Sequence, residues 1–348
     1  MIKRKWPILV LLASGAAALI ASAACSLTGP DAGPRTNGCI SEGCFDSSTD
    51  PPPDGSTPGK DGSTGSDAPT GFPNPIEGTS KAATLVKNGF GFTEGPVWIG
   101  GQLLFSDTSN DVILQLSADE MSTTQFRTNS GGANGNAVDS TGRLVTCEGG
   151  NRRVVRSAVG GGPPLNALAS TFNGVAFNAP NDVIVRSDGN IYFTDPSYGE
   201  DPDAAAHQPK QGLYRIAPGG GGLTRLRQYN SNPNGVALSP DGNTLYVADT
   251  TANVVNYWAL AADGTPSGEQ KFADVTGGDG MAMDDAGNLY VAASTGVIVF
   301  DKTGTQLGTI TVAEQPANCT FGGADRKTLY ITARTGLYKI ALKVPGLP

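Results

Sequence analysis

The stretch Phe92-Thr-Glu-Gly-Pro-Val-Trp98 begins a pattern that recurs along the rest of the chain. Six segments combine a glycine-containing turn with an apolar, strand-like run. Nine to eleven residues before the start of each run stands a residue whose side chain ends in a ligand-type oxygen. These residues are Glu94, Asn134, Asn181, Asn234, Asp279 and Asn318. A repeat protein that carries such an oxygen at the same point of every repeat brings the oxygens together around one axis.

The spacing of the apolar runs predicts the fold. Their first residues follow one another at intervals of 40 to 54 residues: Leu103, Leu144, Ile191, Leu245, Leu289 and Leu329. This interval is typical of a four-stranded propeller blade, which takes roughly 40–50 residues. The 48 Gly and 24 Pro of the 348-residue chain suit many tight turns. We predict an all-β fold, a six-bladed β-propeller over residues 79–348, in which an early strand at residues 83–87 completes the C-terminal blade.

The N-terminus has the three parts of an export signal. Basic residues at 3–5 precede an apolar run at 8–20, and small residues then lead to Cys25. The apolar run is short for a membrane-spanning helix. Cys25 after two alanines resembles a bacterial lipoprotein site, so residues 1–25 predict a lipid-anchored protein of the cell envelope. Ordinary cleavage nearby, which would give a periplasmic or secreted protein, is the alternative.

Residues 26–78 are predicted to be a disordered linker. They are rich in Pro, Gly, Ser and Asp and carry few apolar side chains, so they cannot bury enough surface to offset the entropy of ordering. Cys39 and Cys44 fall in this linker, where a disulfide between them would close a small loop. Cys147 and Cys319 lie in different repeats and are expected to be small buried residues.

Charge and histidine content exclude several function classes. The net charge of −8 argues against nucleic acid and against an anionic membrane surface as partners. The chain has one histidine, His207, which does not support a His-rich zinc site or a histidine triad. We expect a monomer whose contact with a membrane is limited to the lipid anchor.

The six oxygen-bearing residues are predicted to surround one mouth of the central channel, because the innermost strand of each blade starts there. Asn and Asp also favour turns before strands, and this ordinary preference accounts for Asn318 and Asn134 well enough. It does not account for Glu94, which has no such preference. The site is therefore assigned to Glu94, Asn181, Asn234 and Asp279. Acidic residues four positions after the run starts are expected to bond turn backbone instead: Asp107, Glu148, Asp195 and Asp249.

Two carboxylates and two amides form a set of hard oxygen ligands. Such sets select Ca²⁺, Mg²⁺ or Mn²⁺. We expect Ca²⁺, since ligands from four blades suit its long bonds and loose geometry, with Mg²⁺, Mn²⁺ or Zn²⁺ as alternatives. A cation with open positions polarises a carbonyl oxygen, and a carboxylate beside it can deprotonate an attacking water. The set therefore predicts hydrolysis of an activated ester, for which a lactone is the natural case.

Residues from about 88 to 340 resemble the gluconolactonase/SMP-30 family of six-bladed propeller lactonases. The stretches that carry the resemblance are Phe92–Trp98, Gly131–Gly135, Ala179–Val183, Tyr192–Pro196, Pro233–Val236, Gly278–Met281 and Asn318–Gly323. The resemblance implies a divalent site, usually calcium, on Glu94, Asn181, Asn234 and Asp279, with Asp279 as base or nucleophile. We expect substrate contacts from Asn134, Asn178 and Tyr198.

The chain departs from the family pattern at one point. Similar members read Cys-Glu-His-Gly where this chain has Cys147-Glu-Gly-Gly150, which bears on the sugar preference. The sequence predicts an exported, metal-dependent hydrolase of a sugar lactone. Two alternatives stay open: hydrolysis of other esters or organophosphates at the same cation, and a non-catalytic surface propeller in which calcium is a structural plug and the channel mouth a binding platform.

Overall fold

The computed structural model describes residues 71–198 and 204–347. The chain divides into two compact units, residues 1–65 and 66–348, and the first lies outside the described residues. So do the predicted signal, the lipoprotein cysteine, the linker up to residue 70 and the Cys39–Cys44 pair. The packed part of the chain begins before the predicted boundary at residue 79, because the Ile76 side chain is fully buried in a core cluster.

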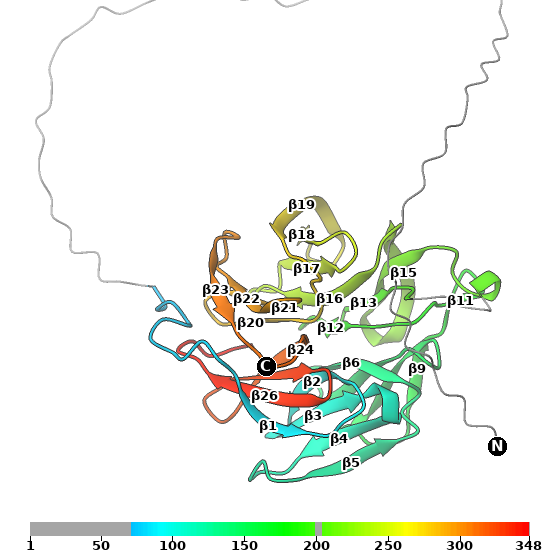
Figure 1. Cartoon of the computed structure of the whole chain (residues 1–348). Helices are drawn as coiled ribbons and strands as arrows, with labels where there is room; N and C mark the ends of the chain where they lie inside the picture. The colour runs from blue at the N-terminus through cyan, green and yellow to red at the C-terminus, as the bar shows by residue number, and fades with distance from the viewer. Residues whose placement is uncertain (1–70, 199–203, 348) are drawn as a thin grey trace, which may run out of the picture. The chain divides into compact units, whose positions relative to one another are not determined.

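Six four-stranded antiparallel sheets form the blades of a β-propeller (Figure 1). Blade 1 consists of β2 (Thr93–Ile99), β3 (Gln102–Asp107), β4 (Val112–Leu116) and β5 (Thr123–Thr128). Blade 2 consists of β6 (Ala133–Val138), β7 (Arg143–Glu148), β8 (Arg153–Val159) and β9 (Asn166–Ala169). Blade 3 consists of β12 (Val183–Val185), β13 (Ile191–Asp195), β14 (Gln211–Ala217) and β15 (Gly221–Tyr229).

The second half of the ring repeats this arrangement. Blade 4 consists of β16 (Pro233–Leu238), β17 (Thr244–Asp249), β18 (Val254–Leu260) and β19 (Pro266–Asp274). Blade 5 consists of β20 (Met281–Met283), β21 (Leu289–Ala293), β22 (Gly296–Phe300) and β23 (Gln306–Ile310). Blade 6 consists of β24 (Pro316–Gly322), β25 (Thr328–Ala333), β26 (Gly336–Ala341) and β1 (Thr84–Asn88).

Short elements complete the description. A two-stranded ribbon of β10 (Thr171–Phe172) and β11 (Val175–Ala176) precedes blade 3. Three 3₁₀ turns occur among the described residues, η1 (Thr108–Asn110), η2 (Ala204–Ala206) and η3 (Pro218–Gly220). Within residues 71–198 and 204–347, no helix has the length and apolar content needed to cross a membrane.

The ring is closed by the pairing of the first strand with the last blade. β1 pairs antiparallel with β26, with Thr84 opposite Lys339 and Asn88 opposite Gly336, and Figure 1 shows the two strands side by side. This confirms the predicted closing strand, and the six-bladed propeller is confirmed with it. The pairing covers the edge of β26 and the edge of β1 that faces it, both of which would otherwise be exposed.

The core lies between the blades. The first apolar residue of each predicted run is buried and belongs to the second strand of its blade: Leu103, Leu144, Ile191, Leu245, Leu289 and Leu329. One cluster joins β3 and β4 to Tyr330 and Leu337 of blade 6. Cys147 and Cys319 are buried free thiols, which confirms their prediction as small buried residues.

Candidate functional site

The innermost strands start at one mouth of the central channel. β2, β6, β12, β16, β20 and β24 face the centre in Figure 1, and each contacts the innermost strands of its neighbours. In four of them the pairing register shifts where the predicted site residue stands, between Glu94 and Val97 in β2 for example. Such β-bulges are frequent beside active sites because they redirect a side chain. The six oxygen-bearing residues therefore lie at corresponding positions around the mouth.

Glycine after the site residue lets neighbouring blades approach closely. A Cβ added to Gly95 would lie 2.0 Å from the carbonyl oxygen of Asn134 in the next blade. A Cβ added to Gly235 would lie 2.1 Å from the carbonyl oxygen of Asp279. Both separations are far inside van der Waals contact, so only glycine fits at these two positions.

Blade 3 departs from this glycine pattern. Asp182 comes directly after Asn181 and is 6% exposed, and its Oδ2 accepts a hydrogen bond from Val236 N of blade 4 at 3.0 Å. A Cβ on Gly135 of blade 2 would lie 2.4 Å from Asp182 Oδ1. Sequence reasoning missed this carboxylate. The available signal was the residue type, because glycine comes after the site residue in four other blades, next to Glu94, Asn134, Asn234 and Asp279.

Three carboxyl groups from three blades affect one another at the mouth. Burial raises the pKa of Glu94 well above its usual range, and the negative charges of Asp279 and Asp182 raise it further. Burial and the charge of Asp182 likewise raise the pKa of Asp279. Burial raises the pKa of Asp182 to about 6. Hydrogen bonding to Asn318 offsets only part of this rise in the pKa values of Glu94 and Asp182. The charge of Arg334 likewise offsets only part of the rise in the pKa of Asp279.

Asn234 is held by two hydroxyl groups. Its Nδ2 donates to Tyr198 OH at 2.8 Å and to Thr250 Oγ1 at 3.1 Å. Thr250 in turn donates to the carbonyl oxygen of Gly278 at 2.6 Å, beside Asp279. The ring of Tyr198 is largely open to solvent, with the residue 49% exposed, whereas burial of its hydroxyl and the charge of Asp279 raise its pKa. Tyr198 therefore forms the rim of the mouth, and Thr250 is a second residue that sequence reasoning missed.

The remaining predicted residues differ in what they contact. Asn134 Oδ1 is buried without a hydrogen-bond partner among the described residues. Asn318 lies within β24 and not in a turn before the strand. Its Oδ1 accepts a hydrogen bond from Cys319 N at 2.8 Å, and its side chain also reaches Glu94 and Asp182. The mouth thus includes Asn318, which the sequence had led us to assign to a turn.

The side chain of Asn178 forms its hydrogen bonds outside the channel mouth. Its Nδ2 donates to Asp195 Oδ2 at 3.2 Å and to the Lys210 carbonyl oxygen at 3.4 Å. These contacts place its amide nitrogen in the loop at the start of blade 3. They do not connect it to Glu94, Asp182 or Asp279.

Three of the four acidic residues at the ends of the second strands accept hydrogen bonds from main-chain amides, as predicted. Asp107 accepts hydrogen bonds from the main-chain amides of residues 91 and 92. Asp195 does the same with the amides of residues 178 and 179, and Asp249 accepts from Ala252 N at 3.0 Å. The Asp249 bond closes a turn, whereas Asp107 and Asp195 hold the segments that lead into β2 and β12. Glu148 instead pairs with the side chain of Arg153 at 2.7 Å.

Gly149, the departure from the family pattern, borders the site. A Cβ there would meet the Pro180 carbonyl oxygen at 3.4 Å and the Ala179 Cβ at 3.8 Å. These are ordinary contact distances, so the position has room for a side chain.

The donor set fits a hard divalent cation. Glu94 and Asp279 would supply two negative charges, and the buried Asn134 Oδ1 has no other partner among the described residues. Oxygen ligands of mixed charge suit Ca²⁺. In the part of the chain that the structure describes, no group of three or more His, Cys, Asp or Glu side chains is arranged to hold a metal. Glu94, Asp182 and Asp279 therefore do not form such a group, and the predicted set combines two carboxylates with two amides.

The comparisons with known proteins decide the family. The profile of the SMP-30/Gluconolactonase/LRE-like region matches residues 92–335. The chain belongs to this family. A gluconolactonase from Zymomonas mobilis is 30% identical over 292 residues, which cover 73% of this chain and 80% of that protein. Lactonase drp35 of Staphylococcus aureus is 35% identical over 140 residues, which cover 38% of this chain and 41% of drp35.

Solved structures of family members are similar to this propeller. The structure of a gluconolactonase from Xanthomonas campestris matches with a TM-score of 0.68 at 34% sequence identity. The match covers 76% of this chain and 89% of that one. The similarity therefore extends over the whole ring.

Proposed function

We propose that this protein hydrolyses a sugar lactone at the channel mouth, with the help of a divalent cation. One observation carries the proposal: carboxyl groups from three different blades come close together, so that the charges of Asp279 and Asp182 raise the pKa of Glu94 and the charge of Asp182 raises that of Asp279. The family and its relatives named gluconolactonase and lactonase support lactone hydrolysis as the reaction. Perturbed carboxyl groups that converge in a concave, partly buried place are typical of catalytic sites.

The proposed ligands of the cation are Glu94, Asn181, Asn234 and Asp279. When bound, a divalent cation would supply Lewis-acid chemistry at the ester carbonyl and offset the negative charge that develops there. Tyr198 and Thr250 would orient Asn234, because both accept hydrogen bonds from its Nδ2. Calcium is the proposed ion, since the amide and carboxylate oxygens come from separate blades and suit a flexible coordination shell.

Asp279 is the proposed base. It is half-buried just before β20, so water and substrate can reach it. As a carboxylate it would accept the proton of the attacking water and hold the water near the ester carbon. Tyr198 at the rim and the free Asn134 Oδ1 are positioned to contact hydroxyl groups of the substrate.

The proposed place of action is outside the cytoplasm. The basic, apolar and small-residue parts of residues 1–25 support export, and Cys25 supports a lipid anchor. If Cys25 carries the anchor, Cys25→Ser should move the protein from the membrane to the soluble fraction. A wild-type protein that is already soluble after export would contradict the anchor.

A lactone panel tests the reaction. Purified protein should open sugar lactones, lose this activity on treatment with a chelator and regain it on addition of calcium. Asp301→Asn, which changes a carboxylate in a turn of blade 5, is a matched control that should behave like wild type. Full activity in the presence of the chelator would contradict metal dependence. Hydrolysis of no lactone, together with calcium binding, would favour the non-catalytic binding platform.

A further inference from the structure

A pocket of about 320 Å³ lies on the face of the propeller opposite the channel mouth. Its wall includes Asp139 in the turn after β6 and Asp188 in the turn after β12. Asn134 stands near the start of β6, whereas Asp139 comes directly after its end. A strand rises about 3.3 Å per residue, so the pocket lies roughly 15–20 Å from the mouth. Asp139, Ser140 and Val185 of this pocket also line a larger cavity of about 580 Å³, whose wall includes Asp182 and Asn318 of the mouth.

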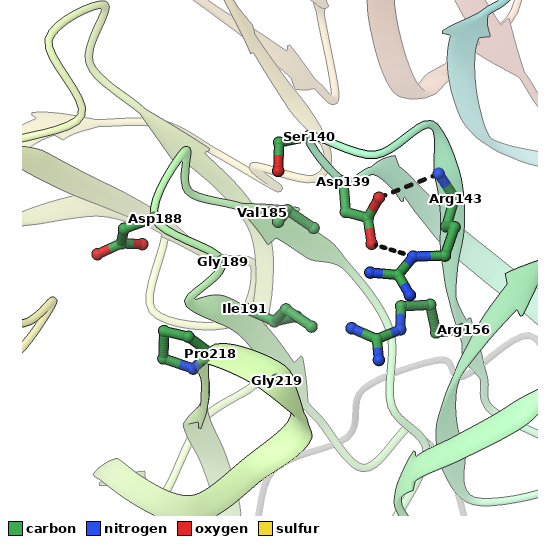
Figure 2. Close-up of a pocket in the computed structure, with 10 residues that line it drawn as sticks. All are labelled: Asp139, Ser140, Arg143, Arg156, Val185, Asp188, Gly189, Ile191, Pro218 and Gly219. Atoms are coloured by element: carbon green, nitrogen blue, oxygen red, sulfur yellow. Dashed lines mark hydrogen bonds and ion pairs between the residues drawn. The ribbon is translucent and has the colours of Figure 1, made fainter. Parts of the chain in front are cut away.

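The guanidinium group of Arg156 faces this pocket. Figure 2 shows Arg156 and Arg143 on one side of the pocket, with Val185, Ile191 and Pro218 across from them. Arg156 Nε is buried and has no hydrogen-bond partner among the described residues. Because Nε is enclosed by the protein, the terminal nitrogens of the guanidinium group are the atoms that a ligand in the pocket could reach.

The other charges at the pocket are already paired. Arg143 Nε donates to Asp139 Oδ2 at 2.9 Å, and the dashed lines in Figure 2 mark the two contacts between these residues. Asp188 pairs with Arg186 at 3.2 Å. Both carboxylates thus have cationic partners, and Arg156 leaves the pocket with one positive charge in excess.

The shape and charge of the pocket select a class of ligand. A guanidinium group matches the planar fork of a carboxylate and can bind it with two hydrogen bonds. The side chains of Val185, Ile191 and Pro218 form an apolar wall opposite this group. A phosphate ion has no aliphatic part to place against this wall, so it gains no apolar burial there.

We propose that this pocket binds a small organic monocarboxylate. Arg156 holds the carboxylate group, and the aliphatic part of the ligand lies against Val185, Ile191 and Pro218. The binding is independent of the reaction proposed at the channel mouth, since no residue is shared between the two sites.

Titration of the full chain with acetate, propionate and butyrate tests the proposal, with amide NMR as the readout and ionic strength held constant with NaCl. The amide signals of Gly189 and Gly219, which line the pocket, should shift, and those of Gly95 and Gly280 at the mouth should not. Affinity should rise roughly fourfold with each added methylene that contacts the apolar wall. Phosphate should bind more weakly than butyrate.

Variants test the role of the guanidinium group. Arg156→Gln should weaken butyrate binding at least tenfold, about the effect of one charged hydrogen-bonded pair. Arg156→Lys, which keeps the charge but loses the fork, should bind with intermediate affinity. Arg225→Gln on β15, which removes an arginine outside the pocket, should bind like wild type. Equal binding by Arg156→Gln and wild type, shifts confined to the mouth, tighter binding of phosphate, or no binding of butyrate to wild type would each overturn the proposal.

Discussion

At the scale of single residues, the channel mouth depends on the residue directly after each oxygen-bearing side chain. Glycine at 95 and 235 brings neighbouring blades into main-chain contact. Asp182 stands at the equivalent place in blade 3 and adds a third carboxyl group to the mouth. The repeated glycine therefore marks the points where neighbouring blades touch. Asp182, which replaces this glycine in blade 3, marks the point where carboxyl groups come together.

The close approach at Gly235 predicts a sharp steric effect. Gly235→Ala places a Cβ 2.1 Å from the Asp279 carbonyl oxygen, so blades 4 and 5 must separate. We expect a loss of about 2 kcal/mol or more in the free energy of unfolding, together with loss of hydrolysis. Urea denaturation measures the first quantity. The control is Gly221→Ala, at an extended position with φ of −92° whose Cβ would meet nothing closer than 3.9 Å. A Gly235→Ala protein as stable as this control would refute the steric argument.

The hydroxyl of Tyr198 predicts an effect on metal affinity rather than on folding. Tyr198→Phe removes the acceptor of the Asn234 amide at the exposed rim. One such hydrogen bond contributes about 1 kcal/mol, so calcium affinity should fall about fivefold while the melting temperature of the metal-free protein stays the same. Calorimetry measures both. Tyr257→Phe removes a hydroxyl that bonds Gln270 on the outer strands of blade 4, and it should leave calcium affinity unchanged. Equal calcium affinities in the two variants would show that the Tyr198 hydroxyl does not contribute to the metal site.

At the scale of elements, the ring depends on one strand that comes from the opposite end of the chain. The β1–β26 pairing and the buried Ile76 side chain join the N-terminal segment to blades 5 and 6. The sequence predicted this strand because residues 83–87 precede the first full blade and could complete the blade at the C-terminus. It did not predict the contribution of Ile76, because one apolar residue among turn formers carries no periodicity.

Two truncations distinguish the contribution of the linker to stability from that of the closing strand β1. Deletion of residues 1–70 should leave the melting temperature unchanged, because the packed structure lies beyond it. Deletion of residues 1–88 removes Ile76 and β1 and exposes the edge of β26. Losing one buried large side chain alone costs about 2–5 kcal/mol, so this protein should unfold well below the first or aggregate through its open edge. Equal melting temperatures by calorimetry would show that ring closure does not stabilise the fold.

At the scale of the whole molecule, the site is assembled from distant parts of the sequence. The fold could be predicted because each blade repeats a local signal, an apolar second strand between glycine turns. Glu94 and Asp279 could be picked out because the repeat places an oxygen at the same point in every blade. Asp182, Thr250 and Asn318 could not, since their roles come from contacts between blades that no single repeat encodes.

The buried carboxyl groups predict how pH acts on the metal-free protein. Burial raises the pKa of Asp182 to about 6, and burial with neighbouring charges raises those of Glu94 and Asp279. In the unfolded chain these groups ionise near pH 4. Because the folded state holds protons more tightly, the stabilisation is complete below about pH 4 and is lost as pH rises through about 6 and above.

Calorimetry of the chelated protein should therefore give a lower melting temperature at pH 8 than at pH 5. Calcium at 100 times its Kd stabilises the fold by about 2.7 kcal/mol, and at a fixed calcium concentration the shift should be larger at pH 8. A chelated protein whose melting temperature does not depend on pH, or a calcium shift equal at both pH values, would contradict the carboxylate cluster.

The central claim is that Asp279 acts both as a ligand and as the base. Asp279→Asn keeps the shape and one ligand oxygen but removes the basicity, and Glu94→Gln is the matched change at a residue proposed to be a ligand alone. The direct measurement is kcat for lactone hydrolysis at saturating calcium. Loss of a general base costs on the order of 10²–10⁴-fold, so Asp279→Asn should stay depressed by at least about 10²-fold, while Glu94→Gln recovers most of its activity. Equal recovery of the two variants would contradict the claim and place the base elsewhere.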